Sequence, residues 1–154
     1  MVGTNNVEGP DMRKFLRFCA GDTTDGNAGL ALLRLFAGAA MMTHGVPKLL
    51  GGPELWQKVG SVMSAIGVPG PAVLWGFLAA LAESLGALAL ALGVLTRASA
   101  ALVAFTMSVA AFVAHRADPF SKRELALLYL AVMLLFVLKG GGKYSVDRAA
   151  GLAR

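Results

Sequence analysis

Four long apolar runs dominate the sequence and limit what it can fold into. They cover residues 28–50, 71–95, 98–115 and 120–138, and each is near the roughly 20 residues that a helix needs to cross a bilayer. The chain is 56% hydrophobic and 15% charged, whereas a soluble domain is about 45–50% apolar and about 25% charged. A surface with so few charges suits lipid better than water. The sequence therefore predicts an all-α fold, an integral membrane four-helix bundle.

A shorter amphipathic segment lies between the first and second runs. It reads ELWQKVGSVMSAIG and covers residues 54–67. Its apolar side chains share one helical face: Leu55, Trp56, Val59, Val62, Met63 and Ile66. Tryptophan is enriched at the interface between membrane and water. We therefore expect a short interfacial helix between helices 1 and 2 of the bundle.

The polar segments divide the chain into one domain with two tails. Residues 1–27 form a polar, basic N-terminal tail, residues 28–149 form the transmembrane domain, and residues 150–154 form a short C-terminal tail. Within the first tail, residues 11–20 predict a basic amphipathic helix on an anionic membrane surface; a solvated flank of the first membrane helix is the alternative. The single cysteine, Cys19, excludes an internal disulfide.

The distribution of Lys and Arg predicts the orientation in the membrane. If both termini lie on one side, that side holds eight basic residues and the opposite side holds five. The eight are Arg13, Lys14, Arg17, Arg97, Lys139, Lys143, Arg148 and Arg154, and the five are Lys48, Lys58, Arg116, Lys122 and Arg123. Because cytoplasmic loops carry the excess of Lys and Arg, we expect a multi-pass protein of the cell inner (plasma) membrane with both termini cytoplasmic. The net charge of +5 favours the anionic lipid bilayer as partner over nucleic acid.

Two charged side chains fall deep inside the apolar runs. Arg34 lies in the first run and Glu83 near the middle of the second. An unpaired charge in lipid is costly. The depths of the two residues differ by five positions, or about 7.5 Å along a helix, which an arginine side chain can largely span. The sequence predicts a buried Arg34–Glu83 ion pair, which either holds the helices together or contacts a substrate or relays a proton.

The two histidines, with a lysine and a glutamate, suggest a second cluster. His44 and His115 have similar depths near the outer end of the bundle, Lys48 is one turn beyond His44, and Glu124 opens the fourth run. We expect these four residues to form a ligand-binding site, in which His and Lys bind the carbonyl of a quinone. Haem ligated by His44 and His115 is one alternative, and ordinary interfacial polar residues are the other. No HExxH, CxxC or phosphate-loop pattern is present, so we predict no metal site and assign no catalytic residue.

Several of these residues occur in stretches that resemble one family. ALLRLFAGAAMMTHGVPKL, with its order R…G…HGxxK, resembles the first helix of the DoxX family, and AESLGALALALGVLTRASA resembles its second helix and turn. His115 and the closing GGKYSVD extend the likeness over residues 29–149. The resemblance implies a four-helix membrane protein of bacterial or archaeal type. Matching positions are Arg34, His44, Lys48, Glu83, Arg97 and His115.

The resemblance also narrows the function. Family members include the small subunit of a thiosulfate:quinone oxidoreductase, and others are linked to membrane-associated oxidoreductase complexes. We therefore expect the membrane subunit of a redox system that binds a quinone or a similar small redox molecule near the outer end of the bundle. One alternative is a non-catalytic membrane anchor or assembly partner of a soluble oxidoreductase. A proton-coupled transporter with Glu83 as the coupling site is the third hypothesis.

Two kinds of protein partner are consistent with the sequence. The redox hypotheses imply a soluble or membrane-bound oxidoreductase. Small residues on the third run, which could also pack within the bundle, offer a face for a homo-oligomer: Ala100, Ala104, Ser108 and Ala111.

Overall fold

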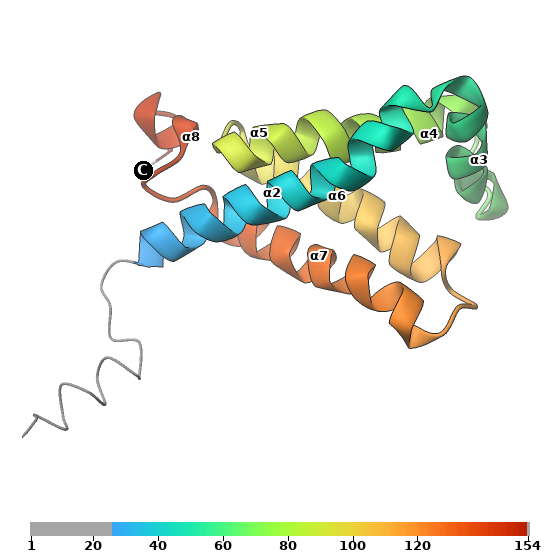
Figure 1. Ribbon diagram of the computed structural model, residues 1–154. Helices are drawn as coiled ribbons and strands as arrows, with labels where there is room; N and C mark the ends of the chain where they lie inside the picture. Colours follow the sequence, from blue (N-terminus) through green and yellow to red (C-terminus); the bar gives the residue numbers. More distant parts are fainter. Residues whose placement is uncertain (1–25, 154) are drawn as a thin grey trace, which may run out of the picture.

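The computed structural model describes residues 26–153, and these fold into helices without any strand (Figure 1). The elements are α2 (Gly26–Leu50), α3 (Gly52–Ala65), α4 (Ala72–Leu81), η1 (Ala82–Gly86), α5 (Ala87–Leu92), α6 (Thr96–Val109), η2 (Ala110–Ala114), α7 (Phe120–Lys139) and α8 (Val146–Ala149). The two η elements are single π-helical turns within longer helices. The predicted basic helix at residues 11–20 lies outside the described residues.

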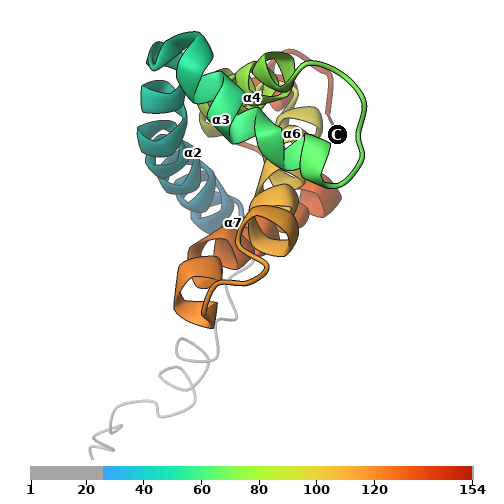
Figure 2. The same cartoon turned by 90° about the vertical axis from the view of Figure 1, so that its right-hand side faces the viewer.

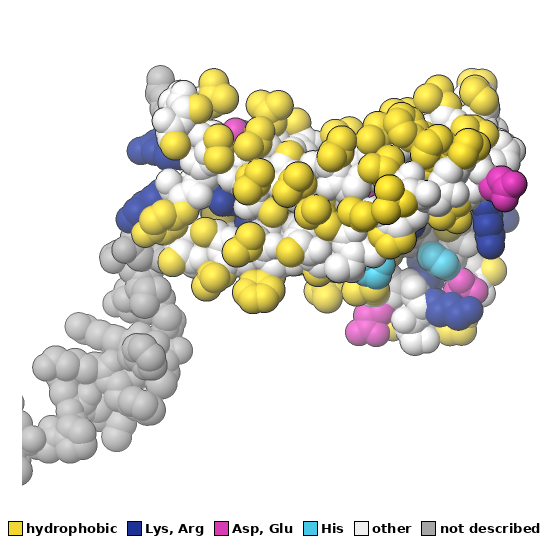
Figure 3. Space-filling view, turned by 45° about the horizontal axis from the view of Figure 1, so that its top comes forward, with side chains coloured by type: hydrophobic (Ala, Val, Ile, Leu, Met, Phe, Trp, Pro, Cys, Tyr) yellow, Lys and Arg dark blue, Asp and Glu magenta, His cyan; other side chains and the backbone are white. Residues whose placement is uncertain are grey.

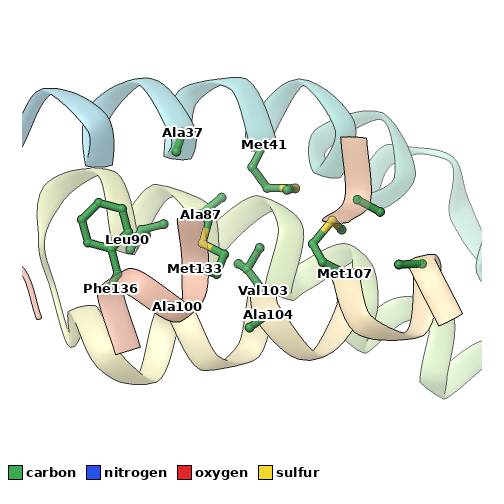
Figure 4. Packing of buried hydrophobic residues seen from close by; sticks show 12 residues of the cluster. Ala37, Met41, Ala87, Leu90, Ala100, Val103, Ala104, Met107, Met133 and Phe136 are labelled. Carbon is green, nitrogen blue, oxygen red and sulfur yellow. The ribbon is translucent and has the colours of Figure 1, made fainter. Parts of the chain in front are cut away.

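Four helical rods lie side by side (Figures 1 and 2). They are α2, the continuous rod α4–η1–α5, the continuous rod α6–η2, and α7. Their shared core contains small and flexible apolar side chains, with Met41, Leu90, Val103, Met133 and Phe136 fully buried (Figure 4). Alanines fill much of the remaining core, and such small side chains let membrane helices approach closely.

The outer surface of these rods is apolar. Large side chains such as Phe36, Phe105 and Leu128 are more than half exposed, and hydrophobic side chains cover the flank between two ends that carry the basic groups (Figure 3). An exposed apolar surface of this extent is abnormal for a soluble monomer. Three helices are long and apolar enough to cross a membrane: Asn27–Leu50, Ala72–Leu92 and Thr96–Ala114. The protein is therefore a helical membrane protein.

The fourth predicted crossing corresponds to α7. This helix has 20 residues and packs along α6, but Lys122, Arg123 and Glu124 all lie in its first turns. Among the described residues it is not one of the candidate spans. A four-helix crossing of the membrane thus stays a prediction, and so does the interfacial position of α3.

The two ends of the bundle differ in structure. At one end, which we call the terminal end, α2 begins and α8 lies near it; there α5 turns into α6 through Gly93 and Leu95, whose backbones are both left-handed (φ 75° and 43°). At the opposite, distal end, α3 lies across the ends of the other helices (Figure 2). Gly60 of α3 packs so closely on α4 that an added Cβ would lie 1.8 Å from the Ala72 carbonyl oxygen. A side chain at Gly60 would therefore push α3 away from the bundle.

Candidate functional site

Arg34 is buried at the terminal end and donates hydrogen bonds to three backbone carbonyls. Its Nε donates to Ala91 at 3.2 Å, its Nη2 to Tyr144 at 3.0 Å, and its Nη1 to Gly141. Ala91 lies at the end of α5, whereas Gly141 and Tyr144 lie in the segment after α7. The planar guanidinium thus ties α2 to two segments that are distant in sequence.

The predicted Arg34–Glu83 ion pair is wrong. Glu83 lies eight residues before Ala91, which accepts a bond from Arg34, so about 12 Å of helix separates the two levels. Side chains on a helix also tilt toward its N-terminus. Because α2 and α4–α5 run in opposite directions, Arg34 tilts toward the terminal end and Glu83 toward the distal end. The two side chains therefore diverge.

Asp147, a residue that sequence reasoning did not assign, completes the terminal end. Its carboxylate accepts hydrogen bonds from the backbone N–H of Leu95 (2.7 Å) and of Thr96 (2.8 Å), and from the Thr96 hydroxyl (2.7 Å). These bonds cap the start of α6 and stabilise the left-handed Leu95. Burial opposes the negative charge, but the bonds from Thr96 and Leu95 and the charge of Arg34 together hold the pKa of Asp147 below its ordinary value.

Glu83 pairs instead with Lys48. Lys48 Nζ lies 2.5 Å from Glu83 Oε2, and the exposed fractions of the two side chains are 33% and 4%. Here the tilt of the side chains brings the two residues together. The Lys48 side chain tilts toward the terminal end, and the Glu83 side chain tilts toward the distal end, where Lys48 lies. The helices also touch: an added Cβ on Gly45 would lie 2.2 Å from the Glu83 carbonyl. Glu83 lies in the π-turn η1, a type of helix irregularity that is frequent at functional sites.

A cavity of about 140 Å³ opens beside this pair. Its polar lining comes from four elements or their ends: His44 and Lys48 of α2, Glu83 of η1, His115 after η2, and Lys122 and Tyr129 of α7. Its apolar lining includes Met41 and Met107. The structure thus brings three of the four predicted ligand-binding residues, His44, Lys48 and His115, to one cavity.

Glu124, the fourth predicted ligand-binding residue, does not join them. It is exposed and does not line the cavity. The lining face of α7 contains Lys122, Leu125, Ala126 and Tyr129, which follow the spacing of three and four residues that marks one side of a helix. Glu124 lies on a different side of α7. Its depth along the helix was therefore not sufficient to predict that it reaches the cavity.

The two histidines have different surroundings in the cavity wall. The His44 ring meets the Tyr129 ring edge to face, with centroids 6.2 Å apart. His115 Nδ1 lies 2.7 Å from Asp118 Oδ2, which leaves the Nε2 atom of His115 for another partner. The hydrogen bond with His115 holds the pKa of Asp118 below its ordinary value, against the opposing effect of burial and with a lesser contribution from the charge of Lys122.

The size and donors of the cavity decide what it can hold. A cavity of about 150 Å³ holds a single benzene ring, so this one admits one six-membered ring. Haem is larger than this cavity, and its ligation by His44 and His115 stays a prediction. Within residues 26–153, no three His, Cys, Asp or Glu side chains are grouped so that they could hold a metal ion.

Together these features define a helical membrane protein with a small cavity, lined by both apolar and charged side chains, at one end of its helices. The profile of the DoxX family matches residues 29–116, which is more than half of the chain, and the protein belongs to this family. Comparisons with curated proteins and with solved structures gave no match. The family match includes Arg34, His44, Lys48, Glu83 and His115 but ends before α7, which adds Lys122 and Tyr129 to the cavity.

Proposed function

We propose that the protein is the membrane subunit of a redox system and binds the ring of a quinone, or of a similar small redox molecule, in the distal cavity. The observation that carries this proposal is the meeting of His44, Lys48 and His115 at a cavity with room for one ring. We place the protein in the plasma membrane with both termini cytoplasmic, because the sequence assigns eight Lys and Arg residues to the side that would hold both termini and five to the other side.

The chemistry of the lining suits a quinone. A quinone ring is apolar on its faces and has two carbonyl oxygens on its edge, so it needs an apolar slot with hydrogen-bond donors at the rim. Met41 and Met107 offer adaptable apolar contacts. Lys48 and either histidine can donate to a carbonyl oxygen. The link between DoxX proteins and quinone-related redox systems supports the same assignment.

The protein's part in the redox reaction is to hold the ring. Reduction of a quinone to a quinol takes two electrons and two protons. In this proposal the electrons come from an oxidoreductase partner, and the protons come from water at the distal end. His44 is exposed and His115 is partly exposed, so both can exchange protons with water at that end.

Binding of tetramethyl-1,4-benzoquinone to the protein in mild detergent tests the proposal. Equilibrium dialysis against protein-free micelles corrects for partition of the quinone into detergent. Lys48→Gln should weaken binding about tenfold, because a charged hydrogen-bond donor is lost. Lys139→Gln removes the same charge from an exposed position at the other end of α7 and should leave the affinity unchanged.

Two results would contradict quinone binding. One is a wild-type protein that neither binds this quinone nor carries quinone in its lipid extract by mass spectrometry. The other is an equal loss of affinity in both lysine variants. Either result would favour the non-catalytic anchor of an oxidoreductase, and capture of that oxidoreductase on the purified chain would then be the next experiment.

A further inference from the structure

Each cation at the distal cavity has a carboxylate beside it. Lys48 pairs with Glu83 at 2.5 Å. Lys122 Nζ lies 3.9 Å from one oxygen of Asp118, and His115 lies 2.7 Å from the other. His44 contacts an aromatic ring. Each lysine that lines the cavity therefore has a carboxylate close by, and of the two carboxylates only that of Glu83 lines the cavity itself.

Glu83 has the larger part in balancing the charges of these lysines. Its side chain is only 4% exposed, whereas the Asp118 side chain is 35% exposed and is screened by water. Among the described residues, Lys48 is the hydrogen-bond partner that the structure gives to the Glu83 carboxylate. Without Glu83, the Lys48 ammonium would face the cavity as an uncompensated charge, and such a charge attracts an anion.

We propose that Glu83 sets the charge selectivity of the distal cavity. Paired with Lys48, it makes the cavity accept a neutral carbonyl compound and reject an anionic one. Lys48 keeps its hydrogen-bond donors for the ligand while its charge is matched. This inference rests on the proposed quinone site, and it makes Glu83 a specificity-determining residue.

A purely structural role for the pair predicts something else. The pair would then only join α2 to η1, which already touch where Gly45 meets the Glu83 backbone. Loss of the Glu83 carboxylate would lower the melting temperature and would reduce the affinities for the neutral and the anionic ligand by the same factor. The ratio of the two affinities therefore separates selectivity from stability.

Two benzoquinones of nearly equal size provide the test. Tetramethyl-1,4-benzoquinone is neutral, and its hydroxy-trimethyl analogue is an anion at pH 7. Wild-type protein should bind the neutral compound at least about tenfold more tightly. In Glu83→Gln, whose amide oxygen can still accept a bond from Lys48, the ratio should move toward the anion by about tenfold or more. Because each ratio is compared between proteins in the same detergent, partition into micelles cancels.

Glu124→Gln is the matched control. Glu124 is exposed near the same end and does not line the cavity, so this variant has the same change in net charge and should keep the wild-type ratio. An unchanged ratio in Glu83→Gln, or an equal shift in Glu124→Gln, would overturn the selectivity role. Wild-type protein that binds both compounds equally would overturn it too, even if Glu83→Gln fails to fold. Wild-type protein that binds neither would instead overturn the proposed function, and the selectivity role with it.

Discussion

The two ends of the bundle both contain buried charge, but they use it differently. At the terminal end, Arg34 donates to three carbonyls and Asp147 accepts from two N–H groups and a hydroxyl. At the distal end, Lys48 and Glu83 share one short contact and border a cavity. At the terminal end each charged group makes three hydrogen bonds inside the protein, whereas at the distal end Lys48 makes one with Glu83 and borders the cavity.

This difference separates a structural cluster from a functional one. Buried polar groups that are fully hydrogen-bonded make a segment rigid and specify its conformation. The bonds of Arg34 and Asp147 hold the segment after α7 against α2 and α6. We therefore expect substitutions at the terminal end to lower stability without changing ligand binding, and substitutions at the distal end to change ligand binding.

Asp147→Asn should have the largest effect on stability. The amide lacks the charge and cannot accept all three hydrogen bonds from Leu95 and Thr96. A hydrogen bond to a charged group contributes about 1.5–3 kcal/mol, so we expect a loss of about 2–3 kcal/mol in the free energy of unfolding. Thermal unfolding in detergent, followed by circular dichroism, measures it. Asp118→Asn changes a partly exposed carboxylate and should have little effect.

Protonation of Asp147 at low pH should destabilise the protein in the same way as Asp147→Asn. Because the pKa of Asp147 is lowered in the folded protein, its contribution to stability is present above the ordinary pKa of an aspartate, about 3.9. It is lost as the pH falls through the folded pKa, when the carboxylate takes up a proton. The wild-type protein should therefore lose more stability than Asp147→Asn between pH 5 and the acid limit. Parallel pH curves for the two proteins would show that the Asp147 carboxylate does not stabilise the terminal end.

Arg34→Lys should have a smaller effect at the same end. A lysine keeps the positive charge but lacks the planar fork that reaches Ala91, Gly141 and Tyr144. Hydrogen bonds within membrane proteins contribute about 0.6 kcal/mol each on average, so the loss of two should cost about 1 kcal/mol. Arg97→Lys is the control, because Arg97 makes one exposed bond to the Leu138 carbonyl. Equal destabilisation by both variants would mean that charge alone matters at Arg34.

The depth of each residue along its helix could be predicted from the sequence, but the direction in which its side chain points could not. Counting residues placed His44, Lys48 and His115 at one level, and the structure has them at one cavity. The same counting paired Arg34 with Glu83, because it ignored the tilt of side chains and set the end of the second helix at residue 95 rather than at Leu92. The distribution of apolar runs was sufficient to predict where the long helices lie in the sequence. Their bounds differ from the expected ones by a few residues.

The contributions of Asp147 and Tyr129 needed tertiary structure. Asp147 occurs in a short polar segment near the C-terminus, and no local pattern indicates that it caps α6, 51 residues earlier. Its position in GGKYSVD, a stretch that resembles the family, was the one available signal. Tyr129 lies in an apolar run, where periodicity predicts a core or lipid-facing residue. Its spacing of seven residues from Lys122 could have placed both on one face of α7.

The smallest expected effect concerns how Lys48 is held in place. The indole of Trp56 donates to the Lys48 carbonyl at 2.9 Å, and its ring lies 4.8 Å from that of Phe77. Trp56→Phe keeps an aromatic ring but removes the donor, so it should lower stability by about 0.5 kcal/mol and weaken quinone binding about twofold to threefold. Isothermal titration with tetramethyl-1,4-benzoquinone measures the change in affinity.

Trp75→Phe is the matched control for this substitution. Trp75 also donates its indole N–H to a carbonyl, that of Pro69, at 3.2 Å, but it does not contact α2 in this way and does not line the cavity. The Trp75→Phe variant should therefore lose about as much stability as Trp56→Phe and keep the wild-type affinity for the quinone. A loss of affinity in both variants would mean that α3 and α4 act on the cavity only through general stability. A loss in Trp56→Phe alone would extend the distal site to α3, whose indole then holds the lysine that meets the ligand.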